Sequence, residues 1–323
     1  MNPPRSWLGR ASRRAVDFIA TPLSPQPLGV FRIGISVLLL IQAWTLSGHL
    51  MELFGNRGLA PWALTDSLAS PWVPRLGTVV QWLQGLGLTP KAGIQGLASV
   101  YALSVVGLLL GWRTRLCAVT AWVLHTVLLG NGVVFLYGLE TFAHISLFYC
   151  AVMPVGAAFS LDRRAGRVSG EPSQAATLSL RVLQIHMSIM YFATGVDKLA
   201  GAPWQQGTAI WQILMQPQYG QFDFSWMAQV PWLSKAVSWG TLVIEIGYPF
   251  FVWPRRTRGF WVLLTLSLHA GIALFMGLWL FSGTMAVLTF AAFGWNVFAP
   301  AVASRIPALR SRLSRPSGVR TLA

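Results

Sequence analysis

The sequence is dominated by apolar runs of about 20 residues, which short polar segments separate. A helix of this length crosses the hydrocarbon core of a bilayer, because it rises about 1.5 Å per residue. Charged residues make up only 10% of the chain, whereas a soluble domain carries about 25%. We therefore predict an all-α fold, a polytopic transmembrane helical bundle of about eight spans. The predicted spans are residues 28–46, 94–111, 116–134, 138–157, 180–197, 237–253, 259–276 and 279–298.

Two longer segments, 47–93 and 198–236, are rich in tryptophan, proline and glycine. Tryptophan concentrates at membrane–water interfaces because its ring is amphipathic. We expect short interfacial helices in both extracytoplasmic segments, with their tryptophans at headgroup level. The tryptophans concerned are Trp62, Trp72, Trp82, Trp204, Trp211, Trp226 and Trp232. The basic segments 1–27 and 299–323 flank the predicted bundle.

The distribution of basic residues gives the bundle an orientation. The net charge of +15 fits either a nucleic-acid binder or a membrane protein with basic cytoplasmic loops. Of the 24 basic residues, 18 fall on the side that holds both termini, five fall on the other side, and Arg32 lies inside the first span. The charge distribution therefore predicts an integral, multi-pass protein with both termini in the cytoplasm, and it explains the basic character without nucleic acid.

The two cysteines, Cys117 and Cys150, lie in apolar runs and form no CxxC motif. We interpret them as small buried apolar residues and expect no metal.

Ionisable residues inside the predicted spans are costly and are candidates for function. They are Arg32, His125, Glu140, His144, His186, Glu245 and His269. Arg32 lies one turn inside its span, and we expect its side chain to extend to the interface. His125 is expected to be a structural histidine. Glu140 and His144 share one helix face, which fits either a self-satisfied pair or a proton relay.

The fifth predicted span carries a polar stripe. Gln184, Ser188, Tyr191, Gly195 and Lys198 are spaced by four, three, four and three residues, which places them on one helix face. Such a face should line the bundle interior or a cavity. Lys198 ends the stripe, either as an interfacial anchor or as an amine that desolvation keeps neutral and basic. Pairing with Asp197 would keep that amine charged. The sequence leaves open whether Glu245 meets Arg32, His269 or Lys198.

The segments 184–199 and 204–211 resemble the vitamin K-dependent gamma-carboxylase family, and most closely its bacterial HTTM branch. Weaker matches lie at 28–34, 55–61, 136–139, 160–163, 245–250 and 269–277, so that the resemblance covers roughly residues 22–298. It assigns residues 28–298 to an HTTM transmembrane domain. It also implies a bacterial cytoplasmic membrane as the location.

The resemblance implies a chemistry. In the carboxylases, the lysine of this segment deprotonates a reduced quinone, whose oxygenation yields a base that abstracts a glutamyl proton before CO2 adds. Here the matching residue is Lys198. We expect Glu140, His144, Tyr191, Glu245 and His269 to position substrate or relay protons, and Gln184, Ser188 and Trp204 to bind the quinone.

This chain departs from the carboxylase pattern. Gly132 and Val133 stand where the carboxylases carry an Asn-His pair, and no large extracytoplasmic domain follows the last predicted span. These departures favour an alternative, a non-catalytic binder of lipid or quinone that scaffolds a partner. The expected partners are membrane lipid and an extracytoplasmic peptide or redox protein. A transporter fits less well, because no inverted repeat is visible.

Overall fold

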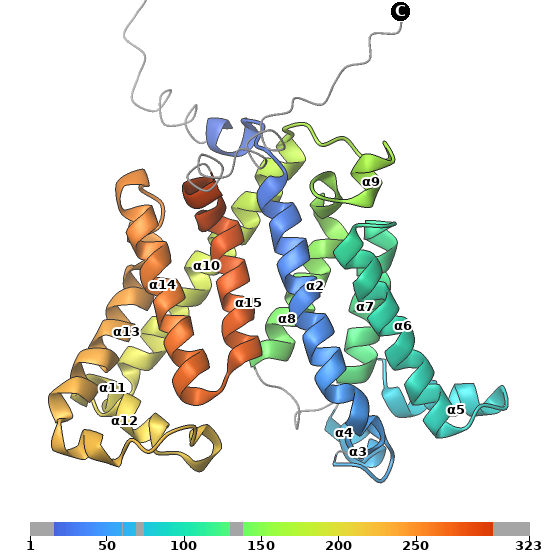
Figure 1. Cartoon of the computed structure of the whole chain (residues 1–323), viewed down its shortest axis with the longest axis horizontal. Helices are drawn as coiled ribbons and strands as arrows, with labels where there is room; N and C mark the ends of the chain where they lie inside the picture. Colours follow the sequence, from blue (N-terminus) through green and yellow to red (C-terminus); the bar gives the residue numbers. More distant parts are fainter. Residues whose placement is uncertain (1–15, 60, 69–73, 130–137, 300–323) are drawn as a thin grey trace, which may run out of the picture. The chain divides into compact units, whose positions relative to one another are not determined.

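The computed structural model describes residues 16–59, 61–68, 74–129 and 138–299 (Figure 1). Within these ranges the chain is helical and forms no strand, apart from an isolated bridge between Leu23 and Ser173. The all-α prediction is therefore confirmed. The Gly132–Val133 departure, Trp72 and the ends of both termini lie outside the described residues.

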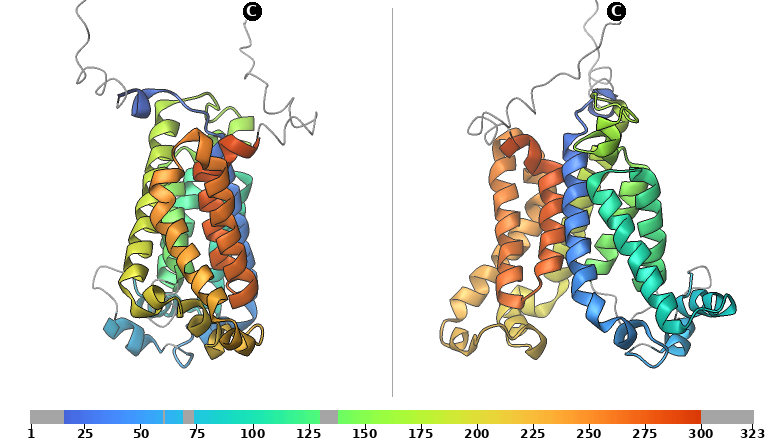
Figure 2. Two further views of the ribbon diagram at one scale, coloured as in Figure 1. Left: turned by 90° about the vertical axis from the view of Figure 1, so that its left-hand side faces the viewer. Right: turned by 45° about the vertical axis from the view of Figure 1, so that its right-hand side comes forward.

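The chain divides into two compact units. The N-terminal unit is residues 28–170, and the C-terminal unit is residues 171–323 together with residues 1–27. The N-terminal unit contains α2 (Gln26–Leu46), α3 (Leu50–Phe54), α4 (Trp62–Leu68), α5 (Leu76–Gly85), α6 (Pro90–Leu110), α7 (Thr114–Leu129), α8 (Gly138–Val152) and α9 (Leu161–Arg164). The C-terminal unit contains α10 (Gln174–Ala200), α11 (Ala202–Gln206), α12 (Ala209–Leu214), α13 (Pro231–Phe251), α14 (Arg255–Met276), α15 (Trp279–Thr289) and a π-helical turn, η5 (Phe290–Gly294). Within each unit the long helices run alongside one another (Figure 2).

Four helical stretches are long and apolar enough to cross a membrane: 26–54, 90–110, 255–276 and 279–299. Two shorter apolar helices, α7 and α8, accompany them. The structure thus supports an integral membrane protein. A helix also lies at each of the eight predicted spans, while the number of crossings and the orientation of the termini stay predictions.

Short helices occupy the two long segments between the predicted spans: α3, α4 and α5 in the first, α11 and α12 in the second. Trp82 and Trp232 are exposed there, as an interfacial position requires. Trp62 is instead buried, and its indole donates to the carbonyl of Phe54 at 2.9 Å. Trp62 therefore packs inside the protein, and its position at headgroup level stays a prediction. Gly77 packs on this indole, since a Cβ there would lie 3.1 Å from Trp62.

Arg32 on α2 is fully buried, so the expectation that it extends to the interface is wrong. Its guanidinium donates to five backbone carbonyls, those of Leu108, Leu109, Val155, Ala158 and Phe159. Two of these carbonyls belong to the last turn of α6, where the helix leaves its carbonyls without intrahelical partners. A cation at this end of a helix is also favoured by the helix dipole. Arg32 is therefore a capping group that joins α2, α6 and the segment after α8.

Asp162 on α9 anchors the next loop. Its carboxylate accepts from the amides of Arg113 and Thr114 at 3.0 and 2.8 Å, from the Thr114 hydroxyl at 2.7 Å and from Arg167 at 3.0 Å. Burial disfavours the charged carboxylate, but the bonds from Thr114, Arg167 and Arg113 outweigh it and lower the pKa of Asp162 to about 2. Arg113 has a positive φ of 45°, an unfavourable conformation for a residue with a side chain, and Asp162 bonds its amide. The segments 28–34 and 160–163 thus carry the residues that fix these loops.

Candidate functional site

The polar stripe of α10 lies inside the C-terminal unit. Gln184, Ser188, Tyr191 and Gly195 are all buried, which confirms that this face is directed inward. Gly195 marks the close approach of α10 to α13. A Cβ at this position would lie 3.0 Å from both the Glu245 Cβ and the backbone nitrogen of Ile246. The glycine is therefore required by the approach of α13, which brings Glu245 to the stripe.

Lys198 and Glu245 form an ion pair at the end of the stripe. The Lys198 Nζ lies 3.0 Å from Oε1 and 2.8 Å from Oε2 of Glu245. The Lys198 side chain is 28% exposed, and that of Glu245 is 9% exposed. Of the three partners that the sequence left open for Glu245, namely Arg32, His269 and Lys198, the structure brings Lys198 into contact with it. Asp197 is exposed, and the carboxylate that pairs with Lys198 is that of Glu245.

An aromatic ring lies beside the ion pair. The Lys198 Nζ is 5.8 Å from the centroid of the Trp204 ring, which is within cation–π range. Trp204 lies on α11, directly after the helix that carries Lys198. The specific sequence match at 204–211 therefore brings a flat apolar surface to the same place as the lysine.

Tyr191 and His269 form a second buried contact in this unit. The Tyr191 hydroxyl lies 2.8 Å from His269 Nε2 and 3.3 Å from the Thr289 hydroxyl. The ring of Tyr191 packs against that of Tyr248, with centroids 4.3 Å apart. His269 is 4% exposed, and its Nδ1 is buried without a hydrogen-bond partner among the described residues. Such an orphaned atom is costly in a folded core and is typical of a functional position.

Gln184 and Ser188 are engaged in bonds within the protein. The Gln184 amide donates to the carbonyl of Ala292 at 2.7 Å, and Trp253 Nε1 donates to the Ser188 hydroxyl at 3.2 Å. Ala292 belongs to the π-helical turn η5, where the regular hydrogen-bond ladder is interrupted. These bonds give both residues a structural role, and their role in binding a quinone stays a prediction. No pattern in the sequence indicated the π-helical turn.

The N-terminal unit holds a separate polar chain around α8. Gln42 Nε2 on α2 donates to Glu140 Oε1 at 3.2 Å. His125 on α7 lies 3.4 Å from the Glu140 carbonyl and 3.3 Å from the Tyr101 hydroxyl. The structural interpretation of His125 therefore agrees with its contacts. Gln42 and Tyr101 were missed, because a lone amide or phenol in an apolar run gives no signal on its own.

His144 lies on the same face of α8 as Glu140. Its Nε2 accepts from the indole of Trp122 at 3.1 Å, and its Nδ1 lies 3.3 Å from the Thr126 hydroxyl. Both contacts come from α7, whereas the bond of Glu140 to Gln42 comes from α2. Glu140 and His144 belong to the N-terminal unit. The other predicted relay and base residues belong to the C-terminal unit: Lys198, Glu245, Tyr191 and His269. The role of Glu140 and His144 in a proton relay stays a prediction.

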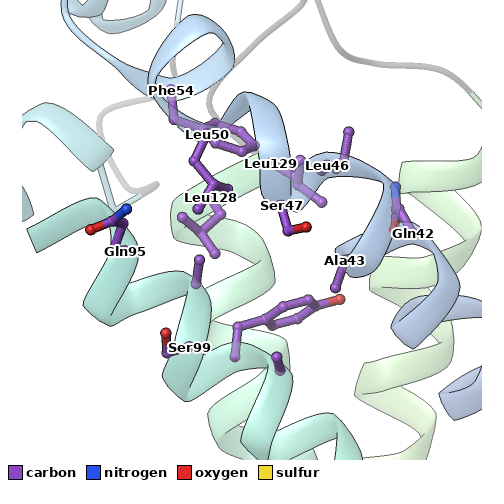
Figure 3. Close-up of a pocket in the computed structure, with 13 residues that line it drawn as sticks. Gln42, Ala43, Leu46, Ser47, Leu50, Phe54, Gln95, Ser99, Leu128 and Leu129 are labelled. Carbon is purple, nitrogen blue, oxygen red and sulfur yellow. The ribbon is translucent and has the colours of Figure 1, made fainter. Parts of the chain in front are cut away.

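A pocket of about 420 Å³ opens above this polar chain (Figure 3). Its lining is mostly apolar: Ala43, Leu46, Leu50, Phe54, Ala98, Ala102, Leu128 and Leu129, with Gln42, Ser47, Gln95, Ser99 and Tyr101 as the polar members. Gln42 Oε1 is buried and has no hydrogen-bond partner among the described residues. The pocket therefore combines an apolar wall with a few polar groups, as small-molecule sites commonly do.

The fold and these sites define a helical integral membrane protein with buried ionisable groups. The HTTM domain family matches residues 20–295, and the chain belongs to that family. The predicted resemblance is thereby confirmed, as is a relation to the membrane domain of the gamma-carboxylases. The chain is also similar to the uncharacterized protein YitO of Bacillus subtilis (strain 168), with 24% identity over 195 residues. That match spans 56% of this chain and 61% of the relative. No solved structure matches the chain.

Proposed function

We propose that this protein is a membrane enzyme in which Lys198 and Glu245 together remove a proton from a lipophilic, weakly acidic substrate. The observation that carries this proposal is the ion pair, in which both carboxylate oxygens lie within 3.0 Å of the lysine nitrogen. The family relation makes a reduced quinone the substrate class, and the reaction class is quinol-dependent oxygenation.

The pair can exchange a proton internally. Two opposite charges are expensive to hold in an apolar medium, where a neutral amine beside a neutral carboxylic acid competes with the ion pair. Transfer of one proton from Lys198 to Glu245 along the 2.8 Å contact leaves the amine with a free lone pair. That lone pair accepts the proton of a bound hydroxyl, which makes Lys198 the general base and Glu245 the store for the first proton.

The surrounding residues suit a flat hydroxylated ring. The Lys198 side chain is partly exposed, and Trp204 provides an aromatic face beside its nitrogen. Further along the same helix face, about 10 Å from Lys198 at 1.5 Å per residue, Tyr191 and His269 offer a hydroxyl and an unsatisfied ring nitrogen. A reduced quinone, when bound, supplies the electrons for reaction with oxygen. The chain supplies the proton acceptor and the aromatic surface.

The test is quinol-dependent oxygen uptake by the purified full-length protein. Replacing Lys198 with Ala should reduce uptake at least about a hundredfold, the usual value of a positioned general base. Lys235→Ala is the matched control, because Lys235 also lies over an aromatic ring, that of Trp239 at 4.7 Å. The double variant Lys198→Ala/Glu245→Ala also removes the carboxylate that Lys198→Ala leaves unpaired. A double variant that folds but takes up no oxygen therefore shows a loss of chemistry and not a loss of folding. Equal uptake by wild type and Lys198→Ala would exclude this role.

A second candidate is a lipophilic-ligand binder without catalysis. The pocket of Figure 3 favours it, because a largely apolar lining with a few polar groups suits a lipophilic ligand. Replacing Ala102 with Phe would fill the pocket. If this function holds, the purified wild type retains a lipid that Ala102→Phe loses, and oxygen uptake is absent from both proteins. Equal lipid content in the two proteins would exclude it.

We further propose that all eight long helices cross the membrane and that both termini are cytoplasmic. The charge distribution and the helix at each predicted span support this topology. A reporter fused after Arg320 should read as cytoplasmic, and an extracytoplasmic signal would overturn the topology.

A further inference from the structure

A second cavity lies in the C-terminal unit, at the opposite end of α10 from Lys198. It has a volume of about 800 Å³. Its lining residues are Phe18, Leu23, Ser24, Pro27, Leu180, Arg181, Gln184, Trp253, Arg255, Arg258, Asn296 and Val297. Three of them are arginines and none is acidic, so the lining carries three positive charges without a carboxylate of its own. The function proposed above does not use this cavity.

Two of the arginines are held in place by the protein. Arg181 donates from Nε to the Phe18 carbonyl at 3.0 Å and from Nη1 to Gln184 Oε1 at 2.8 Å, and it packs on the Phe18 ring at 4.0 Å. Arg258 donates from Nε to the Val252 carbonyl at 3.1 Å. A guanidinium has five N–H donors. Each of these arginines therefore keeps donors for a ligand while its position is already fixed, which lowers the entropic cost of binding.

The three charges are close enough to act on one another. All three guanidinium groups line the same cavity, whose lining residues include no acidic side chain. Like charges held together in a partly desolvated cavity raise its free energy, and a bound anion removes that cost. Planar guanidinium groups also match the oxygens of a phosphate with paired hydrogen bonds.

We propose that this cavity binds a phosphate-bearing anion, either the headgroup of an anionic phospholipid or free phosphate. The polar donors are the three arginines with Ser24 and Asn296, while Trp253, Leu180 and Val297 give the same cavity an apolar side that suits the glycerol and first acyl carbons of a lipid. Basic pockets between transmembrane helices recognise anionic headgroups in this way. The charge distribution predicts that this end of the unit faces the cytoplasm.

The cavity also touches the polar stripe. Arg181 bonds to Gln184, and Trp253 bonds to Ser188, so that two residues of the stripe share bonds with residues that line the cavity. An anion here would therefore fix the end of α10 that is remote from Lys198.

The first turn of α14 provides a matched pair of variants. Arg255 and Arg256 are exposed neighbours, and only Arg255 lines the cavity. Native mass spectrometry of the full-length protein, released from nanodiscs that contain phosphatidylglycerol or only phosphatidylcholine, counts the retained lipids. We expect the wild type and Arg256→Gln to retain phosphatidylglycerol equally. Arg255→Gln should retain at least about tenfold less, since a hydrogen bond between two charged groups inside the cavity contributes about that factor. Arg258→Lys should also lose retention, because an ammonium cannot bond in a paired fork.

A parallel titration with inorganic phosphate distinguishes the two sources. If phosphate displaces the retained phosphatidylglycerol, or raises the melting temperature of the wild type but not of Arg255→Gln, the site accepts the free anion as well. If phosphate does neither while lipid retention depends on Arg255, the lipid headgroup is the ligand. Equal retention by all variants, or equal loss in Arg255→Gln and Arg256→Gln, combined with no effect of phosphate, would overturn the proposal.

Discussion

Each of the two units holds a cation that oxygen atoms of the protein bind, and the two cations are bound in different ways. Arg32 is fully buried and bonds to five backbone carbonyls, which are neutral and cannot take up a proton. Lys198 is 28% exposed and bonds to one carboxylate, and a carboxylate can take up a proton. A guanidinium also stays charged under all ordinary conditions, whereas an amine can become neutral. Bonds to neutral carbonyls thus give Arg32 a stabilising role in the N-terminal unit. The carboxylate partner of Lys198 allows, by our proposal, proton transfer in the C-terminal unit.

The largest expected effect on stability comes from Arg32. Replacing it with Met removes the side-chain donor from all five carbonyls, of which that of Leu108 still accepts from the Gly111 amide at 3.0 Å. We expect a loss of at least about 3 kcal/mol, because several buried carbonyls lose their donor and each unsatisfied polar group costs about 1–3 kcal/mol. Unfolding of the purified protein in detergent measures it, with the exposed Arg57→Met as the control. A loss below about 1 kcal/mol for Arg32→Met would show that these bonds are not the anchor described above.

The second effect depends on pH and belongs to Asp162. The pKa of this carboxyl is lowered to about 2 in the folded protein, against about 3.9 in an unfolded chain. Its ionised form therefore stabilises the fold by about 3 kcal/mol. That contribution is complete above about pH 4 and is lost as the pH falls toward 2.

Unfolding measured from pH 5 down to pH 2.5 should therefore show a steeper loss of stability for wild type than for Asp162→Asn. The exposed Asp17→Asn serves as control and should follow the wild type. Parallel curves for wild type and Asp162→Asn would contradict the account of this carboxylate.

The smallest effect tests the close helix approach that brings Glu245 to Lys198. A methyl group at Gly195 would press on the backbone of α13, and we expect Gly195→Ala to cost about 1 kcal/mol. Gly240→Ala on α13 is the matched control, because a Cβ there meets nothing within 4 Å. That control should be neutral or stabilising by up to about 1 kcal/mol, since alanine favours a helix over glycine. Identical effects of both changes would show that the approach at Gly195 is not tight.

The sequence predicted those features that depend on one helix at a time. Apolar runs located the long helices, and the spacing of Gln184, Ser188, Tyr191 and Gly195 identified the buried face of α10. The spacing also singled out Lys198. Each of these inferences needs only the length and the period of a single helix.

Contacts between helices could not be predicted from one sequence. The partner of Glu245 depends on how α10 packs against α13, and the burial of Arg32 depends on the folded segment after α8. Residue type alone suggested that a long cation near a helix end would reach the interface. The carbonyls that hold Arg32 instead are present in every residue, so no side-chain pattern marks them.

The central claim is that Glu245 takes part in the removal of a proton by Lys198, and Glu245→Gln tests it most directly. Glutamine has nearly the same shape and can still bond to the lysine, but it cannot store a proton. We expect quinol-dependent oxygen uptake to fall at least about a hundredfold, while the variant folds and Lys235→Ala keeps the wild-type rate. Wild-type uptake by a folded Glu245→Gln protein would contradict the claim.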